Sequence, residues 1–274
     1  MRSLLFLMLL LSSTAFAAPP ERPWPLPNVE TRPLVDVFAV PDGFERVLVP
    51  NGSFGAWLRE LPIRSDRTHV LAYDGRRLGS PSAGIVALDV GSKDLQQCAD
   101  TAMRLYAEWR WATSTADALT FHFTSGDPVD WKSWRKGKRW WLENDKVKSG
   151  ARAGTDNSYA SFRRFLDLVF TYAGTRSLPK DSVAVSAAQP GDFFVQSGSP
   201  GHVVVVMDVA ENEDGKRIAL IGQGFMPAQE LHILRSSGDR VIEGVWFELP
   251  TTDHPDIKTP SWKAFSAGDL RRFK

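Results

Sequence analysis

The sequence contains a single cysteine, Cys98, and a histidine, His202, that directly precedes four consecutive valines. A run of β-branched residues predicts a strand buried on both faces, so His202 is expected at the mouth of a rigid strand. Cys98 lies in a segment with helical spacing. A thiol near a helix N-terminus and beside an imidazole is held more readily as the thiolate, its nucleophilic form. The two residues therefore predict nucleophilic catalysis if the fold brings them together.

Glutamines could complete such a site. An imidazole base needs a third polar group that orients its ring, and Gln223 follows the next predicted strand along the chain. Gln97, or its neighbour Gln96, could donate a hydrogen bond to an oxyanion. The order of helix cysteine, strand histidine and strand polar residue is similar to that of the papain-like hydrolases. The candidate catalytic residues are therefore Cys98, His202 and Gln223, and the candidate oxyanion donor is Gln97.

Both catalytic candidates also have an ordinary structural explanation. Cys98 shares an apolar helix face with Leu95, Ala102 and Leu105, and a buried free cysteine behaves as a small hydrophobic residue. His202 could equally be a buried histidine with a purely structural role. The sequence leaves these interpretations open, because it does not show whether the two side chains meet.

Tryptophan residues are interleaved with lysine and arginine residues between positions 131 and 141. Aromatic rings stack on sugars and cations pair with acidic groups, so this segment predicts a binding surface for a cell-wall polymer. The candidate substrate-binding residues are Trp131, Trp134, Arg135, Trp140 and Trp141. The alternative is that these rings fasten a long loop to the protein core.

Periodicity predicts two main helices. Residues 92–111 start at the potential cap Ser92 and place Asp100, Arg104 and Glu108 on the side expected to face solvent. Residues 159–172 carry the second helix. Shorter helices are expected at 54–60 and 267–273, and strands at 35–40, 44–49, 70–73, 84–90, 119–124, 202–209, 217–222, 230–234 and 245–247. This mixture predicts an α+β fold, in which an antiparallel sheet has its helices packed on one side.

The composition is that of a globular protein. Of the 274 residues, 43% are hydrophobic and 24% are charged, and the net charge is +1. The low net charge argues against nucleic-acid binding through bulk charge. The five histidines show no metal-binding spacing, and neither a phosphate-binding glycine loop nor a serine-hydrolase elbow occurs. We therefore predict no metal and no other cofactor.

The N-terminus has the parts of a secretory signal peptide in the right order. Arg2 precedes the apolar residues 4–11, and Ala15-Phe16-Ala17 forms a small-x-small cleavage site. We expect a signal peptide at 1–17, a proline-rich leader at 18–33 and a single α+β domain at 34–274. The mature protein would be exported, to a periplasm or the medium, and has no apolar run long enough to span a membrane.

Two family resemblances follow from particular segments. Residues 190–209, with Gly191-Asp192 and Gly201-His202-Val203, resemble the corresponding strand of the NlpC-type cell-wall cysteine hydrolases. That resemblance implies cleavage of peptide bonds in peptidoglycan by a cysteine, a histidine and a third polar residue. It also makes the predicted fold compatible with a papain-like or NlpC-like arrangement.

The second resemblance covers almost the whole mature chain. The segments that carry it are 54–62, 94–100, 170–175 and 226–229, with sequences such as Asp94-Leu95-Gln96-Gln97-Cys98-Ala99-Asp100 and Met226-Pro227-Ala228-Gln229. They are similar to the uncharacterised bacterial family called domain of unknown function 4846. This resemblance implies no established activity.

Together these observations predict an exported cell-envelope protein that acts as a papain-like thiol hydrolase on an amide bond, such as one in cell-wall peptide. The alternative is a non-catalytic domain on the same scaffold that binds envelope glycan or protein.

Overall fold

The computed structural model describes residues 22–260 and 262–274. The predicted signal peptide and the first part of the proline-rich leader lie outside the described residues. The described end of the leader is packed against the protein, because Trp24 is buried and its indole Nε1 donates a hydrogen bond of 2.9 Å to the carbonyl of Ala87. None of the described helices has both the length and the hydropathy of a membrane span.

The described chain is a mixed α/β structure with few helices. The helices are α1 (Leu34–Val37), α2 (Phe54–Arg59), α3 (Cys98–Ala112), α4 (Trp131–Arg135), α5 (Tyr159–Tyr172) and α6 (Leu178–Asp181), with 3₁₀ turns at Ala116–Ala118 and Ala267–Asp269. The strands are β1 (Thr31–Pro33), β2 (Phe44–Arg46), β3 (Pro62–Arg64), β4 (Ser82–Ile85), β5 (Thr120–His122), β6 (Pro128–Asp130), β7 (Lys138–Glu143), β8 (Lys146–Ala151), β9 (Ser182–Ala184), β10 (Phe193–Gln196), β11 (His202–Asn212), β12 (Arg217–Gln223), β13 (His232–Leu234), β14 (Val241–Ile242), β15 (Trp246–Glu248), β16 (Asp256–Ile257), β17 (Phe265–Ser266) and β18 (Leu270–Phe273).

One antiparallel sheet organises the fold, with β11 near its centre. Its main path runs β14-β15-β12-β11-β10-β18-β9, and β13 joins β12 to β4. The paired strands β10, β11 and β12 run antiparallel to their neighbours. The valines of β11 alternate between two apolar clusters, one on each face of the sheet. The prediction of an antiparallel sheet with a strand buried on both faces is confirmed.

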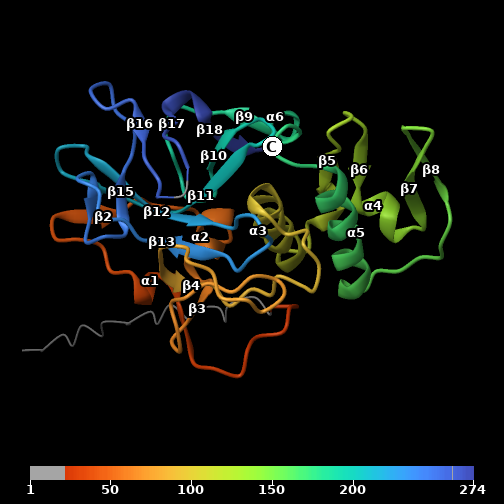
Figure 1. Ribbon diagram of the computed structural model, residues 1–274, viewed down its shortest axis with the longest axis horizontal. Coiled ribbons are helices and arrows are strands. Elements are labelled where there is room, and N and C mark those ends of the chain that lie inside the picture. The colour runs from red at the N-terminus through yellow and green to blue at the C-terminus, as the bar shows by residue number, and fades with distance from the viewer. Residues whose placement is uncertain (1–21, 261) are drawn as a thin grey trace, which may run out of the picture.

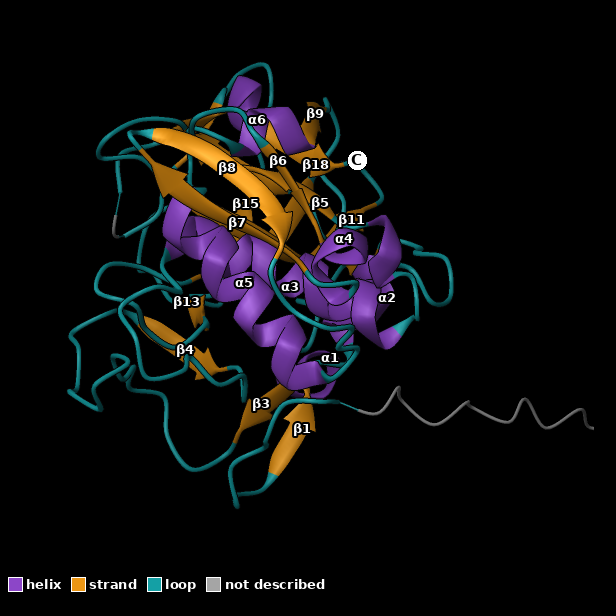
Figure 2. Ribbon diagram, turned by 90° about the vertical axis from the view of Figure 1, so that its right-hand side faces the viewer, coloured by secondary structure: helices purple, strands orange, loops and turns teal. Residues whose placement is uncertain are grey.

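The two faces of this sheet are covered differently. Helices α2 and α3 pack against β11 on one face, while the β16–β17 hairpin packs near β10 within the cluster of the other face. Figure 1 shows α4, α5 and the hairpins β5–β6 and β7–β8 gathered at one end of the molecule, with α3 between them and the sheet. Figure 2 shows α3 and α5 side by side.

Helix α3 begins later than its periodicity predicts. It starts at Cys98, and Gln97 is its N-cap, whereas a cap at Ser92 was expected. The backbone N–H of Gln97 donates a hydrogen bond of 3.0 Å to Oδ2 of Asp100, which fixes the start of the first turn. Cys98 is therefore the first helical residue.

The side of α3 predicted to face solvent is buried. Asp100, Arg104 and Glu108 are 6%, 0% and 0% exposed. The prediction was wrong because α5 covers this side of the helix, and its Tyr159 donates a hydrogen bond to Glu108. A helix enclosed on two sides does not show its environment through periodicity alone.

Several shorter elements also differ from the predictions. Residues 34–37 form a helix in place of a strand, and residues 70–73 take part only in isolated bridges. The segment 267–273 is a 3₁₀ turn followed by β18, because its last residues pair with β9 and β10. The hairpin β7–β8 was not predicted, although Asn144 and Asp145 at its turn both have positive φ, which these residue types tolerate in two-residue hairpins.

Candidate functional site

The three predicted catalytic residues lie where α3 meets the central sheet. Cys98 opens α3, His202 opens β11, and Gln223 ends the neighbouring strand β12. The backbone N–H of Val203, the residue after His202, interacts with the Cys98 thiol. The fold therefore places the thiol next to the first residues of the strand that carries His202.

A hydrogen bond joins two members of this group directly. Nε2 of His202 lies 3.0 Å from Oε1 of Gln223, and both side chains are buried. The Gln223 amide nitrogen in turn lies 3.4 Å from Nε2 of His232, and Nδ1 of His232 lies 3.0 Å from the carbonyl oxygen of Glu230. Two histidines and a glutamine thus form a buried chain that ends on a backbone carbonyl.

From the sequence, His232 lies in the predicted strand 230–234 and could approach His202, but it was given no role in the site. In the sheet, Gln223 and His232 are direct cross-strand partners of β12 and β13. The two strands had been predicted on either side of a short connection, so a hairpin register would have brought these residues together. That register is the signal that could have identified His232.

Aromatic rings enclose the His202 imidazole. The ring centroids of Phe225, Trp262 and Phe265 lie 4.8, 5.1 and 6.0 Å from that of His202. The indole Nε1 of Trp262 donates a hydrogen bond of 2.9 Å to Oε1 of Gln196, which holds that ring in place. This enclosure limits the access of water to the imidazole.

Burial keeps both the thiol and the two imidazoles neutral. Burial lowers the pKa of His202 to about 4, against the hydrogen bond to Gln223, and lowers the pKa of His232 to about 4. Burial also raises the pKa of Cys98 to about 11, although the N–H of Val203 favours the thiolate. The sequence-based expectation that the helix N-terminus and the imidazole favour the thiolate is therefore outweighed by desolvation.

A groove with a volume of about 600 Å³ reaches Cys98. One wall is the first turn of α3, another is the chain after α5, and a third is the loop 198–201. The hydroxyl of Thr175 donates a hydrogen bond of 3.2 Å to the carbonyl of Gly198, which ties two of these walls together. Cys98 is 6% exposed and lines the groove, whereas His202 is fully buried behind it.

Close packing fixes the loop that leads into His202. A side chain at Gly201 would place its Cβ 2.3 Å from the Thr175 hydroxyl and 2.7 Å from the carbonyl oxygen of Gln196. Such distances are far below van der Waals contact, so only glycine fits here. This glycine lets the loop lie against the end of α5 and deliver His202 directly behind the groove.

The two glutamines before Cys98 have different positions. Gln97 lines the groove, and its amide Nε2 donates a hydrogen bond of 3.2 Å to Oδ1 of Asp94. Gln96 is fully buried, and its Oε1 accepts a hydrogen bond from Arg104. Only Gln97 of these two faces the groove, where the backbone N–H groups of the first turn of α3 are further potential donors.

The tryptophan segment lies in a different part of the molecule. Trp131, Trp134 and Trp140 are 2%, 7% and 7% exposed and belong to the core. They offer almost no ring face to a sugar, in agreement with the structural alternative. Trp141 is half-buried, with the Arg152 guanidinium 3.3 Å from its ring centroid. Arg135 is held by a bidentate ion pair with Asp117.

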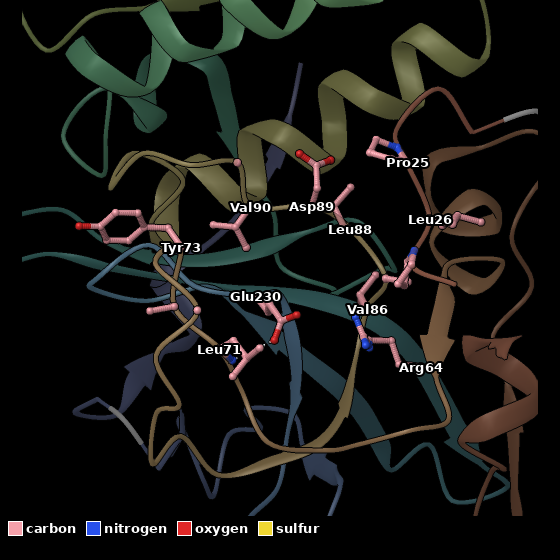
Figure 3. A pocket seen from close by; sticks show the side chains of 15 residues that line it. Pro25, Leu26, Arg64, Leu71, Tyr73, Val86, Leu88, Asp89, Val90 and Glu230 are labelled. Atoms are coloured by element: carbon pink, nitrogen blue, oxygen red, sulfur yellow. Dashed lines mark hydrogen bonds between the residues drawn. The ribbon is translucent and has the colours of Figure 1, made fainter. Parts of the chain in front are cut away.

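A second cavity, of about 390 Å³, is lined in part by Glu230 (Figure 3), the residue whose backbone carbonyl ends the histidine chain. Its charged lining residues are Arg64, Asp89 and Glu230. Each is already paired, Arg64 with Asp66, Asp89 with Arg104, and Glu230 with Arg67. Within the described chain, no cluster of three or more histidine, cysteine or acidic side chains could hold a metal ion.

Comparison with known proteins gives one match. The family described as "Domain of unknown function (4846)" matches residues 34–272. No curated protein and no solved structure matches the chain.

Proposed function

Because the chain belongs to a family whose description names no activity, we propose its function from the site alone: the protein is a papain-like thiol hydrolase that cleaves an amide bond. Cys98 is the nucleophile, His202 is the general base and then the general acid, and Gln223 orients the imidazole. The observation that carries the proposal is the hydrogen bond between His202 and Gln223, at the start of the strand whose Val203 N–H interacts with the Cys98 thiol.

The neutral resting state decides how the first step proceeds. Burial raises the pKa of Cys98 to about 11, so the enzyme rests with a protonated thiol and a neutral imidazole. His202 removes the thiol proton as the sulfur bonds to the carbonyl carbon of the substrate. The developing oxyanion is stabilised by N–H groups at the start of α3 and by the Gln97 amide.

The remaining steps return the enzyme to its starting form. The carbon–nitrogen bond breaks, and the imidazolium gives its proton to the leaving amine, which leaves a thioester on Cys98. Water then attacks the thioester carbon while His202 takes one of its protons. The carbon–sulfur bond breaks, the carboxylic acid product departs, and the proton returns to sulfur.

The groove suits a peptide without strong negative charge. Among the described residues that line it are Asp94 and Asp100 and no lysine or arginine. An anionic substrate would meet no compensating cation there. A neutral peptide needs none, and an amine-bearing peptide would lie near the carboxyl group of Asp94. We propose peptide amide bonds of the cell wall as the substrate class, in line with the export predicted from the N-terminal sequence.

The test is the cleavage of cell-wall peptides by the purified mature chain. New amines and carboxylates are detected by mass spectrometry. Cys98→Ala is expected to abolish turnover, and His202→Gln to lower it by about 10²-fold or more, as expected on loss of a general base. His254→Gln is the matched control, since His254 is exposed and is expected to leave turnover unchanged. Equal turnover by wild type and Cys98→Ala would overturn the proposal.

The alternative is a non-catalytic domain that binds envelope glycan or protein. The feature that favours it is the β7–β8 hairpin, where Leu142 is 49% exposed next to the half-buried Trp141. A glycan that quenches tryptophan fluorescence in the wild type but not in Trp141→Ala would support this alternative.

A further inference from the structure

We infer that His232 is a positioning residue for the proposed hydrolase: acting through Gln223, it fixes the tautomer of His202 so that Nδ1 carries the lone pair that accepts the Cys98 proton. The inference rests on the proposed function for its catalytic meaning, but the tautomer is a property of the resting protein. Each hydrogen bond along this chain of buried side chains has a definite donor and a definite acceptor.

The direction is set at the backbone carbonyl of Glu230. A carbonyl oxygen can only accept, so Nδ1 of His232, which lies 3.0 Å away, must carry the proton. His232 is neutral because burial lowers its pKa to about 4. A neutral imidazole has one protonated nitrogen, so Nε2 of His232 has a lone pair.

Gln223 passes this direction to His202. Its amide nitrogen lies 3.4 Å from Nε2 of His232 and donates to that lone pair. The Gln223 oxygen, Oε1, is therefore the atom that faces Nε2 of His202, 3.0 Å away. Because Oε1 only accepts, the proton of the neutral His202 must lie on Nε2. The reverse orientation of the amide would place two acceptors, or two donors, in contact at one of these positions.

The consequence falls on Nδ1 of His202. This nitrogen is buried, and it has no hydrogen-bond partner among the residues that the structure describes. A buried acceptor without a partner is destabilising. The next residue along β11, Val203, directs its backbone N–H at the Cys98 thiol, so the unused lone pair belongs to the residue adjacent to the strand's contact with Cys98.

The charged groups near this chain of side chains do not change which atoms donate and which accept its hydrogen bonds. The carboxylate whose charge acts on His232 is that of Glu230, and it already accepts hydrogen bonds from Arg67 and from the backbone N–H of Leu71. On the side of Cys98, burial raises the pKa of Asp100 well above its usual range, which favours the uncharged form of this group.

The sheet holds His232 in position from two sides. It pairs with Gln223 on β12 and with Ile85 on β4. Its backbone is therefore held by registers on both neighbouring strands, and its ring is held by the contacts with Gln223 and the Glu230 carbonyl, which suits a residue that sets the orientation of another side chain.

The experiment measures the tautomer directly. The ¹⁵N shifts of the histidine side chains are recorded for the full mature chain at neutral pH, and His202 is assigned by the loss of its signals in His202→Gln. The expected spectrum has a pyridine-type Nδ1 and a pyrrole-type Nε2 for His202. A wild-type His202 that carries its proton on Nδ1 would overturn the inference, whatever the activity.

Two matched variants then test the role of His232. The longer side chain of His232→Gln keeps an acceptor near the position of Nε2, where it can bind the Gln223 amide. The side chain of His232→Asn is too short to reach Gln223 and keeps only the hydrogen bond to the Glu230 carbonyl. We expect His232→Asn to mix the two His202 tautomers and to lower kcat about tenfold with little change in KM, and His232→Gln to retain the tautomer and most of kcat. An unchanged His202 tautomer in His232→Asn would contradict the role of His232.

The outcomes separate this inference from the proposed function. If no cell-wall peptide is cleaved but His202 has the expected tautomer and His232→Asn disturbs it, the hydrolase proposal fails and the positioning role stands. If Cys98-dependent cleavage occurs while the wild-type tautomer is reversed, the hydrolase proposal stands and the inference fails.

Discussion

Two buried polar networks lie against different faces of α3, and they differ in charge. Near the start of the helix, the chain of His202, Gln223 and His232 is neutral. Further along, Arg104 binds Glu108 at 2.8 Å and Asp89 at 2.8 Å, and Arg163 lies 3.7 Å from Asp89. In this second network two cations balance two anions.

The difference separates an ion-paired network from the neutral one to which the proposed hydrolase assigns proton transfer. Burial alone would lower the pKa of Arg104, but Glu108 and Asp89 raise it above its usual range. An ion cluster of this kind is locked, because removing any charge leaves its partner buried and uncompensated. The histidine chain holds no net charge, and because the pKa of each imidazole is about 4, adding one proton at pH 7 costs about 4 kcal/mol. It also begins at His202, the residue that follows the loop 198–201 at the wall of the groove.

The largest effect is expected from breaking the charged network. Arg104→Met leaves Glu108 buried without its cation and should lower the free energy of unfolding by about 3–5 kcal/mol, measured by urea denaturation. The control is Arg104→Met/Glu108→Leu, which removes both charges and should lose less than the single variant. A single-variant loss below about 1 kcal/mol would show that the cluster does not lock α3.

The next effect is a pH dependence that comes from the neutral network. His202 and His232 have folded pKa values of about 4, below the ordinary 6.5, so the unfolded chain binds more protons between these values. Their contribution to stability is fully present above pH 6.5 and is lost as the pH falls towards 4. At about 1.4 kcal/mol for each pKa unit, each histidine contributes up to about 3–4 kcal/mol.

The measurement is the free energy of unfolding at several pH values between 7 and 4. Asp100 acts in the opposite direction, because burial raises its pKa and its protonated form is favoured in the fold. Asp100→Asn should therefore steepen the loss on acidification, and His232→Gln should make it shallower. If the free energy of unfolding of His232→Gln falls with pH as steeply as that of the wild type, His232 does not contribute to this pH dependence.

A smaller effect tests how the neutral network is held against α3. A Cβ at Gly224 would lie 2.2 Å from the Thr101 hydroxyl and 3.2 Å from the carbonyl oxygen of Gln97. Gly224→Ala should therefore push the end of β12 away from the first turn of α3 and cost about 1–3 kcal/mol of stability, as overpacking does. It should also change the rate at which iodoacetamide modifies Cys98.

Two variants control for this substitution. Gly79→Ala adds the same methyl group where no atom lies within 4 Å, and it should change neither stability nor thiol reactivity. Gly224→Ala/Thr101→Ala removes the clashing hydroxyl and should recover part of the lost stability. Equal behaviour of Gly224→Ala and Gly79→Ala would show that this contact does not position the site.

The sequence predicts the sheet and much of the neutral network for a physical reason. The valines after His202 are apolar in every register, so a strand buried on both faces was the one arrangement that satisfied them. Gln223 directly follows the predicted strand 217–222 and precedes Gly224, which placed it at the end of the adjacent strand. His232 was missed because its position depends on cross-strand register between β12 and β13, which is a non-local property.

The charged network was hidden from the sequence for the opposite reason. Arg104 and Glu108 are typical of a solvent-facing helix surface, and only the packing of α5 shows that they are buried. The start of α3 was also missed, because Ser92 is a better cap by residue type than Gln97. The tertiary hydrogen bond from the Ala228 N–H to Asp94, at 2.6 Å, holds the preceding turn outside the helix.

The smallest effect is expected at the surface, away from both the neutral network and the charged network. The Arg152 guanidinium lies 3.3 Å from the ring centroid of the half-buried Trp141. A double-mutant cycle with Trp141→Ala and Arg152→Ala should give a coupling free energy of about 0.5–1 kcal/mol, the range of exposed cation–π contacts. A coupling well above this range would mean that the Trp141–Arg152 contact is shielded from water. The contact would then resemble the buried ion pairs of Arg104, and the β7–β8 hairpin would not be an open binding surface.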